Sequence, residues 1–98
     1  MRPLDEVTPP TVTIKLSGEY DIARADELRD AFLVPLDGAV WLTADMTDVT
    51  FVDSTGLGAL ITAHTLMAAR GVTMRMTEPT PAVRRVFEVT GVAKMFGL

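Results

Sequence analysis

The chain has 98 residues, a net charge of −4 and no cysteine. This length is typical of one domain with a modest core, so we interpret residues 1–98 as a single domain. The acidic balance argues against a nucleic-acid binder, which needs a basic face, and favours a basic protein partner. The lack of cysteine excludes disulfides, cysteine–zinc sites and thiol catalysis.

The sequence carries no sign of export or membrane insertion. Residues 1–10 lack the basic start and apolar run of a signal peptide. The apolar runs elsewhere are only a few residues long, far below the ~20 that a membrane-spanning helix needs. We therefore expect a cytoplasmic protein.

Two strands are predicted at the start of the chain. Leu4 to Val7 is a candidate edge strand closed by Pro9 and Pro10, because proline cannot donate to a central ladder. Residues 11–17 alternate between apolar and polar side chains, which predicts a half-buried strand. Gly18 then opens a predicted turn.

A helix is expected next, with Asp21 as its cap. Pro35 and Gly38 end this element. The apolar positions of the helix are Ile22, Ala25, Leu28 and Phe32.

The middle of the chain predicts a central strand and a second helix. Residues 39–45 carry apolar side chains on both faces, which favours a strand covered on both sides, at least in part. Residues 45–50 are polar and predict a turn, and Phe51 and Val52 lead into a loop around Ser54. The helix that follows ends near Gly71. Its apolar stripe comprises Leu57, Leu60, Ile61, His64, Met67 and Ala68.

The last part predicts one more strand and one more helix. Residues 72–77 alternate again, and Thr80-Pro81 is typical of a helix start. That helix ends at Gly91, and residues 92–98 are expected to pack as a final turn. Its buried stripe comprises Val83, Val86 and Phe87.

Strands separated by helices imply parallel pairing with right-handed crossovers. The predicted fold class is therefore α/β, with a sheet of strands and several helices. Ligand and partner sites of such sheets lie beyond the carboxyl ends of strands. The turn at residues 17–21 and the Ser54 loop both follow strands, so they can share one end of the molecule.

Ser54 is the most informative residue of the chain. It stands where a strand meets a helix, and a serine there can cap the helix or carry a phosphate that the helix end tolerates. Gly56 and Gly58 follow in the first helical turns, where each glycine costs up to about 1 kcal/mol relative to alanine. Two glycines there need a reason, such as close approach of a backbone or a ligand, or tight packing on the sheet.

Three other kinds of site are considered for the Ser54 loop. A hydrolase is disfavoured because the only histidine, His64, lies ten residues along the same helix, about 15 Å away. A dinucleotide site is disfavoured because Ile61 stands where the fingerprint needs a small residue, and no Walker loop is present. A magnesium site would use Asp45, Asp48 and Asp53. These are more simply read as turn and cap residues, and no lysine lies nearby to balance a transferring phosphoryl group.

Five segments in register resemble the STAS domain of the anti-sigma factor antagonist type, over nearly the whole chain. Leu16-Ser17-Gly18-Glu19-Tyr20-Asp21 resembles the family's Leu-x-Gly-Glu-Leu-Asp turn, with Tyr20 in place of leucine. The others are Trp41 to Met46, Phe51 to Gly58, Arg70-Gly71, and Pro79 to Gly91. The resemblance implies a STAS fold: a mixed, mostly parallel sheet of four to five strands with three or more helices.

The resemblance also implies a function. An antagonist of this type binds an anti-sigma factor, a kinase-like protein, and thereby releases a sigma factor. The kinase phosphorylates the loop serine, here Ser54, the complex separates, and a phosphatase resets it. Thr55 is left open as an alternative acceptor. No cofactor, metal or enzymatic activity is implied. The residues expected to meet the partner are Asp21, Asp53, Ser54, Thr55, Gly56 and Leu57.

Other functions remain as alternatives at this point. One keeps the fold but makes the chain an unphosphorylated STAS subunit of a membrane transporter or lipid-transport complex. A second is a small metal-dependent enzyme that uses the acidic cluster. A third is the binding of a nucleotide at the Ser54 loop.

Overall fold

The computed structural model describes residues 11–98. The predicted strand at residues 4–7 lies outside the described residues. The elements are β1 (Thr11–Tyr20), the 3-10 turn η2 (Ile22–Arg24), α1 (Ala25–Asp30), β2 (Trp41–Val52), α2 (Ser54–Ala69), β3 (Thr73–Thr77), α3 (Pro81–Val89) and the 3-10 turn η3 (Ala93–Phe96).

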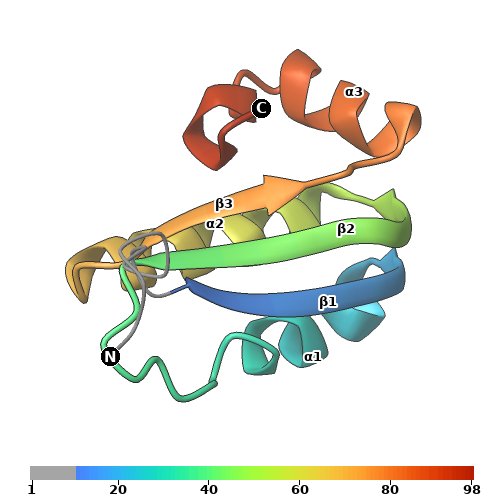
Figure 1. The fold of residues 1–98 in the computed structure, drawn as a ribbon. Helices are drawn as coiled ribbons and strands as arrows, with labels where there is room; N and C mark the ends of the chain where they lie inside the picture. The colour runs from blue at the N-terminus through green and yellow to red at the C-terminus, as the bar shows by residue number, and fades with distance from the viewer. Residues whose placement is uncertain (1–10) are drawn as a thin grey trace.

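The described strands form one parallel sheet in the order β1-β2-β3, so β2 is central as predicted. Helix α2 runs behind the sheet, and α1 packs against α2 and β1 (Figure 1). Helix α3 contacts β2, and η3 contacts β3. The α/β class is confirmed, with three strands within residues 11–98. No helix in that range has both the length and the apolar run needed to cross a membrane.

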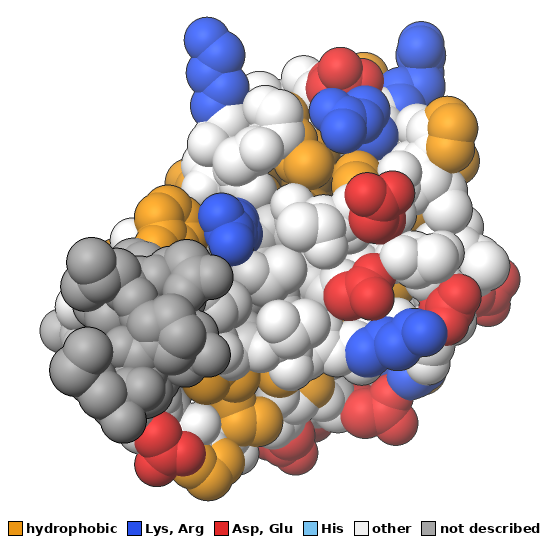
Figure 2. Space-filling view, in the orientation of Figure 1, with side chains coloured by type: hydrophobic (Ala, Val, Ile, Leu, Met, Phe, Trp, Pro, Cys, Tyr) orange, Lys and Arg blue, Asp and Glu red, His pale blue; other side chains and the backbone are white. Residues whose placement is uncertain are grey.

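The other face of the sheet is largely exposed among the described residues, and side chains of the sheet itself bury one residue on it, Thr43. Arg75 lies over the ring of Trp41, 4.6 Å from its centroid, and its Nε donates to the Thr43 hydroxyl at 3.1 Å. Thr43 is thereby buried on this face. On this side of β2, Thr43 is buried and Trp41 and Asp45 are half-buried, so the predicted cover of both sides is limited here to these residues. Away from the grey residues, uncharged polar side chains and backbone occupy much of this face (Figure 2).

Two predicted turns are wrong, because both segments are strand. Residues 45–50 continue β2, and Gly18 lies within β1. The pairing of β1 with β2 shifts between Lys15 and Ser17 and again at Gly18, and each shift places one extra residue in β2. These are β-bulges, in which two residues of one strand lie opposite one residue of its partner and the ladder is locally disrupted. Gly18, which lies beside the second shift, has a φ of 81°, a conformation open to glycine.

Arg24 holds the second bulge together. Its Nη1 donates to the carbonyls of Ser17 and Glu19 at 2.9 and 3.0 Å. Its guanidinium lies 4.4 Å from the centre of the Tyr20 ring and pairs with Glu27, which raises the pKa of Arg24. The Tyr20 hydroxyl accepts from the Ser17 N–H at 3.1 Å. Tyrosine in place of the family's leucine therefore contributes a hydrogen bond to this bend.

The first predicted helix is shorter and less regular than expected. The Asp21 cap is confirmed, because its carboxylate accepts from the Ala23 N–H at 3.0 Å. Leu28 and Phe32 are buried as predicted. The placement of Ile22 in the buried stripe is wrong: it lies in η2 and is 78% exposed.

Helix α2 buries three of the six residues of its predicted stripe, namely Leu57, Leu60 and Met67. Ile61 is half-buried and Ala68 is exposed. His64 is half-buried, and its ring lies 5.4 Å from that of Phe96 in an edge-on contact.

The C-terminal elements lie where they were predicted, and Val83 and Phe87 are buried while Val86 is half-buried. Thr80 caps α3, since its hydroxyl accepts from the Val83 N–H at 3.3 Å, and Pro81 occupies the first turn. Residues 92–98 contain η3, which buries Phe96 completely. The Phe96 ring lies 5.3 Å from that of Phe87, so the tail closes one end of the core.

Replacing Phe96 with alanine is expected to lower the free energy of unfolding by about 3–5 kcal/mol, because it leaves a cavity beside Phe87 and His64. Met95→Ala is the matched control, since Met95 is 41% exposed in the same turn. Urea unfolding of both variants measures the difference. Equal losses would show that the tail does not contribute to the core.

Candidate functional site

The candidate site lies where the carboxyl ends of β1 and β2 meet the start of α2. Tyr20 pairs with Val52 at the last position of the β1–β2 ladder. The Asp53 N–H continues the ladder by donating to the Tyr20 carbonyl at 3.2 Å. The segment at residues 17–21 and the Ser54 loop therefore share one end of the molecule, as predicted.

Asp53, and not Ser54, caps α2. One carboxylate oxygen of Asp53 accepts from the N–H groups of Thr55 and Gly56, at 2.8 and 2.9 Å. This satisfies two of the amides that a helix start leaves unpaired. Ser54 is the first residue of α2, is exposed, and its hydroxyl makes no hydrogen bond within residues 11–98. The hydroxyl is therefore accessible to a reagent or a partner.

Gly56 is required by its contact with β1. A Cβ at this position would lie 2.4 Å from the Tyr20 carbonyl oxygen, which is a backbone atom. The close approach of a backbone, one of the reasons proposed for the two glycines, is thus the one that applies here. Gly58 differs, because a Cβ there would have nothing within 4 Å. Gly58 leaves the helix surface beyond Ser54 bare.

The other predicted contact residues occupy different environments. Thr55 is exposed, and Asp21 is half-buried at the start of η2. Leu57 is 7% exposed and belongs to the core, so its side chain anchors the helix start. Among the predicted residues, Ser54 and Thr55 are the ones that present exposed side chains.

The three aspartates of the magnesium hypothesis are engaged separately. Asp45 accepts from the hydroxyl and the N–H of Thr47, at 2.6 and 3.0 Å, and these bonds lower the pKa of Asp45. Asp48 lies 3.1 Å from the Lys15 ammonium and raises the pKa of that lysine. Asp53 is the helix cap. Residues 11–98 contain no cluster of acidic, histidine or cysteine side chains suited to a metal ion.

Two exposed apolar side chains at this end were not predicted as site residues. Ile22 follows the Asp21 cap, and Phe51, 48% exposed, precedes Ser54 by three residues. Phe51 faces water because the bulge at residues 49–51 shifts the alternation of β2. A sequence signal existed: Phe51 and Val52 are adjacent in a strand, so one of them must face outward.

The profile of the family described as "Mlab, STAS domain" matches residues 5–97. The chain therefore belongs to the STAS domain family.

Curated relatives are named as regulators of sigma factors. The anti-sigma-B factor antagonist of Bacillus subtilis is 29% identical over 82 residues, which cover 83% of this chain and 74% of the relative.

Solved structures of antagonists share the fold. An anti-sigma factor antagonist from Mycobacterium paratuberculosis is 28% identical with a TM-score of 0.78, covering 93% of this chain and 78% of the other. The unphosphorylated antagonist SpoIIAA is 26% identical with a TM-score of 0.70, covering 91% and 79%. SpoIIAA of Bacillus has also been solved in its phosphorylated form. A sulfate transporter family protein from Wolinella succinogenes, 18% identical with a TM-score of 0.76 and coverage of 97% and 80%, shares the fold alone.

Alanine at the two loop glycines is expected to act in opposite directions. Gly56→Ala should lower the free energy of unfolding by about 1–3 kcal/mol, because its Cβ meets the Tyr20 backbone. Gly58→Ala should raise it by about 0.5–1 kcal/mol, because alanine favours an exposed helix and the space is open. Urea unfolding measures both. The same sign of change in the two variants would contradict the assigned role of the Tyr20 contact.

Proposed function

We propose that this chain is an anti-sigma factor antagonist controlled by phosphorylation of Ser54. In the unmodified state it binds an anti-sigma factor with kinase activity, and the sigma factor is freed. The observation that carries the proposal is the exposed Ser54 hydroxyl, left unbonded because Asp53 caps α2. The antagonists named above, and the existence of a phosphorylated SpoIIAA, support the same reading.

The proposed chemistry makes the chain a substrate and not an enzyme. The Ser54 oxygen attacks the γ-phosphorus of ATP held by the partner, ADP leaves, and the hydroxyl proton passes to a base of the partner. A separate phosphatase hydrolyses the phosphoserine and restores the hydroxyl. We place this cycle of partner switching in the cytoplasm, where ATP and sigma factors meet.

Phosphorylation at this position should leave the domain folded. A phosphate adds about −1.5 to −2 charge at neutral pH, and the positive end of a helix dipole favours that charge. The amides of Thr55 and Gly56 are already bonded to Asp53, so the cap does not depend on Ser54. The modification therefore acts on the outer surface of the domain.

The same charge should separate the complex. We propose that the partner packs over Ser54 and the exposed side chains of Ile22 and Phe51. A phosphate in that contact would lie beside the Asp53 carboxylate. Arg24 offers no compensation, because its guanidinium is committed to the β1 bulge and to Glu27. Burying an uncompensated dianion is costly enough to release a partner.

The proposed function predicts that Ser54 is phosphorylated. Protein recovered from its own host is expected to carry one phosphate on Ser54, measured by intact mass and phosphopeptide analysis. The Ser54→Ala variant should lose the phosphate and Thr55→Ala should keep it. A phosphate on Thr55 alone, or none in any growth state, would contradict the proposal.

The proposed function also predicts that a negative charge at position 54 affects binding of the partner and not the stability of the fold. Ser54→Asp is expected to leave the melting temperature nearly unchanged, because Asp53 still caps the helix. Its affinity for the anti-sigma factor captured by the wild-type chain from its host should fall about tenfold or more. Ser54→Ala is the control and should retain binding. A large loss of melting temperature in Ser54→Asp, or unchanged affinity, would count against a switch at the interface.

A further inference from the structure

An apolar groove lies between α1 and the C-terminal half of α2, away from Ser54. Its volume is about 460 Å³. Three buried side chains form its floor, namely Phe32, Ala63 and Met67. Leu33 and Leu66 flank it and are 78% and 58% exposed. We call this feature the α1–α2 groove.

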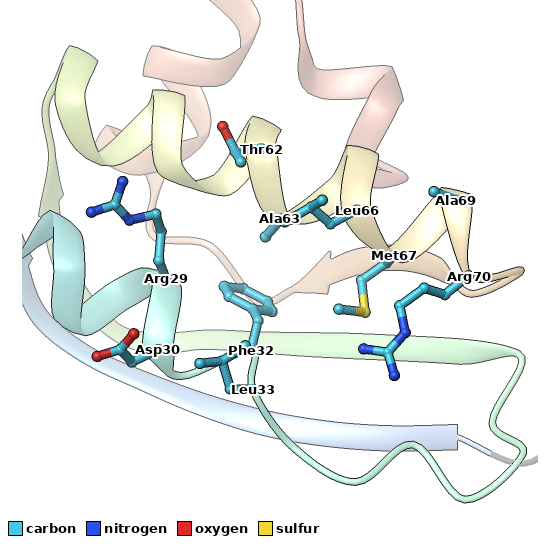
Figure 3. A pocket seen from close by; sticks show the side chains of 10 residues that line it. All are labelled: Arg29, Asp30, Phe32, Leu33, Thr62, Ala63, Leu66, Met67, Ala69 and Arg70. Atoms are coloured by element: carbon cyan, nitrogen blue, oxygen red, sulfur yellow. The ribbon is translucent and has the colours of Figure 1, made fainter.

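The size and the lining of the α1–α2 groove suit a small apolar ligand. Sites for small molecules are concave, about 300–1,000 Å³ in volume, and mostly apolar with a few polar groups that fix orientation. Ala63 and Ala69 keep the groove open, because neither side chain extends across it (Figure 3). Leu33 and Leu66 are large apolar groups left in water, so a ligand that covers them gains hydrophobic free energy.

The two ends of the groove differ in charge. Arg29 and Arg70 lie at opposite ends, with Phe32 and Met67 between them (Figure 3). Arg29 forms an ion pair with Asp26, and Asp30 adds a further negative charge to that end.

Arg70 lies at the other end, where α2 finishes. Its guanidinium makes no ion pair or side-chain hydrogen bond within residues 11–98. One end of the groove is thus compensated, and the arginine at the other end has no ion pair among residues 11–98.

We propose that the α1–α2 groove binds a fatty acid, with the acyl chain on the floor and the carboxylate on Arg70. A guanidinium matches a carboxylate with two parallel hydrogen bonds, which gives such a pair both strength and orientation. A carboxylate at the opposite end would meet Asp30 and an arginine that is already paired. The charges therefore fix the direction in which the ligand lies.

Titration calorimetry of the full chain with decanoate tests the proposal, below the micelle concentration. Decyltrimethylammonium is the matched probe, since it has the same chain and the opposite charge. Decanoate is expected to bind about tenfold more tightly, a difference typical of a hydrogen-bonded charged group. Amide shifts in a heteronuclear NMR spectrum should concentrate at Leu33, Leu66 and Arg70.

Variants of the groove test which residues contact the carboxylate and which contact the acyl chain. Arg70→Gln should weaken decanoate about tenfold and leave the cationic probe unchanged, whereas Arg84→Gln, at an exposed arginine on α3, should change neither. Leu33→Asn should weaken both probes, and Val89→Asn, at a residue 75% exposed on α3, should weaken neither. Leu33 and Arg70 are exposed, so both variants are expected to fold, which a thermal melt checks.

Several outcomes would overturn the proposal. These are equal affinities for the two probes, equal effects of Arg70→Gln and Arg84→Gln, or amide shifts that map outside the groove. A further one is a dimer in sedimentation velocity that Leu66→Asn abolishes, together with no binding of decanoate. That result would assign the groove to a second copy of the chain.

Discussion

The structure depends on one backbone contact, in which the start of α2 lies directly against the end of β1. The Tyr20 carbonyl accepts from the Asp53 N–H, and Gly56 approaches the same oxygen so closely that no side chain fits. This contact fixes where the helix begins relative to the sheet. The Asp53 cap then follows from position, and Ser54 is left on the outside of the first turn. A single glycine thus sets the geometry of the whole candidate site.

Regular elements were readable from the sequence, because their periodicity and end signals agree. The alternation in β1 and β3 and the Thr80-Pro81 start of α3 gave both type and approximate position. The errors arose where polar residues lie within a strand. Residues 45–50 resemble a turn in composition, but their polar groups are accommodated by bulges that require the neighbouring strand to be seen. The prediction for Ile22 was wrong because this residue lies in a 3-10 turn, and not in the helix whose spacing was assumed.

The candidate site was predicted in outline, with both Asp53 and Ser54 offered as the cap of the helix. The sequence pointed to Ser54 as a cap or a phosphate acceptor, and local spacing alone does not separate the two. The structure gives the cap to Asp53, which leaves Ser54 unbonded. The adjacent pair Phe51 and Val52 indicates that one of the two faces outward, but which of them does so depends on a bulge. The α1–α2 groove is formed by residues far apart in the chain, so no local sequence pattern predicts it.

The helical backbone of Ser54 has a consequence for how a kinase could recognise it. An acceptor in an extended loop can be threaded into a cleft as a short peptide. Ser54 instead belongs to the first turn of a 16-residue helix whose start is held by β1. If the proposed function holds, the kinase must recognise a folded surface that is formed by β1, β2 and α2. A synthetic peptide of residues 48–60 would then be a poor substrate, and unfolding would protect Ser54 from modification.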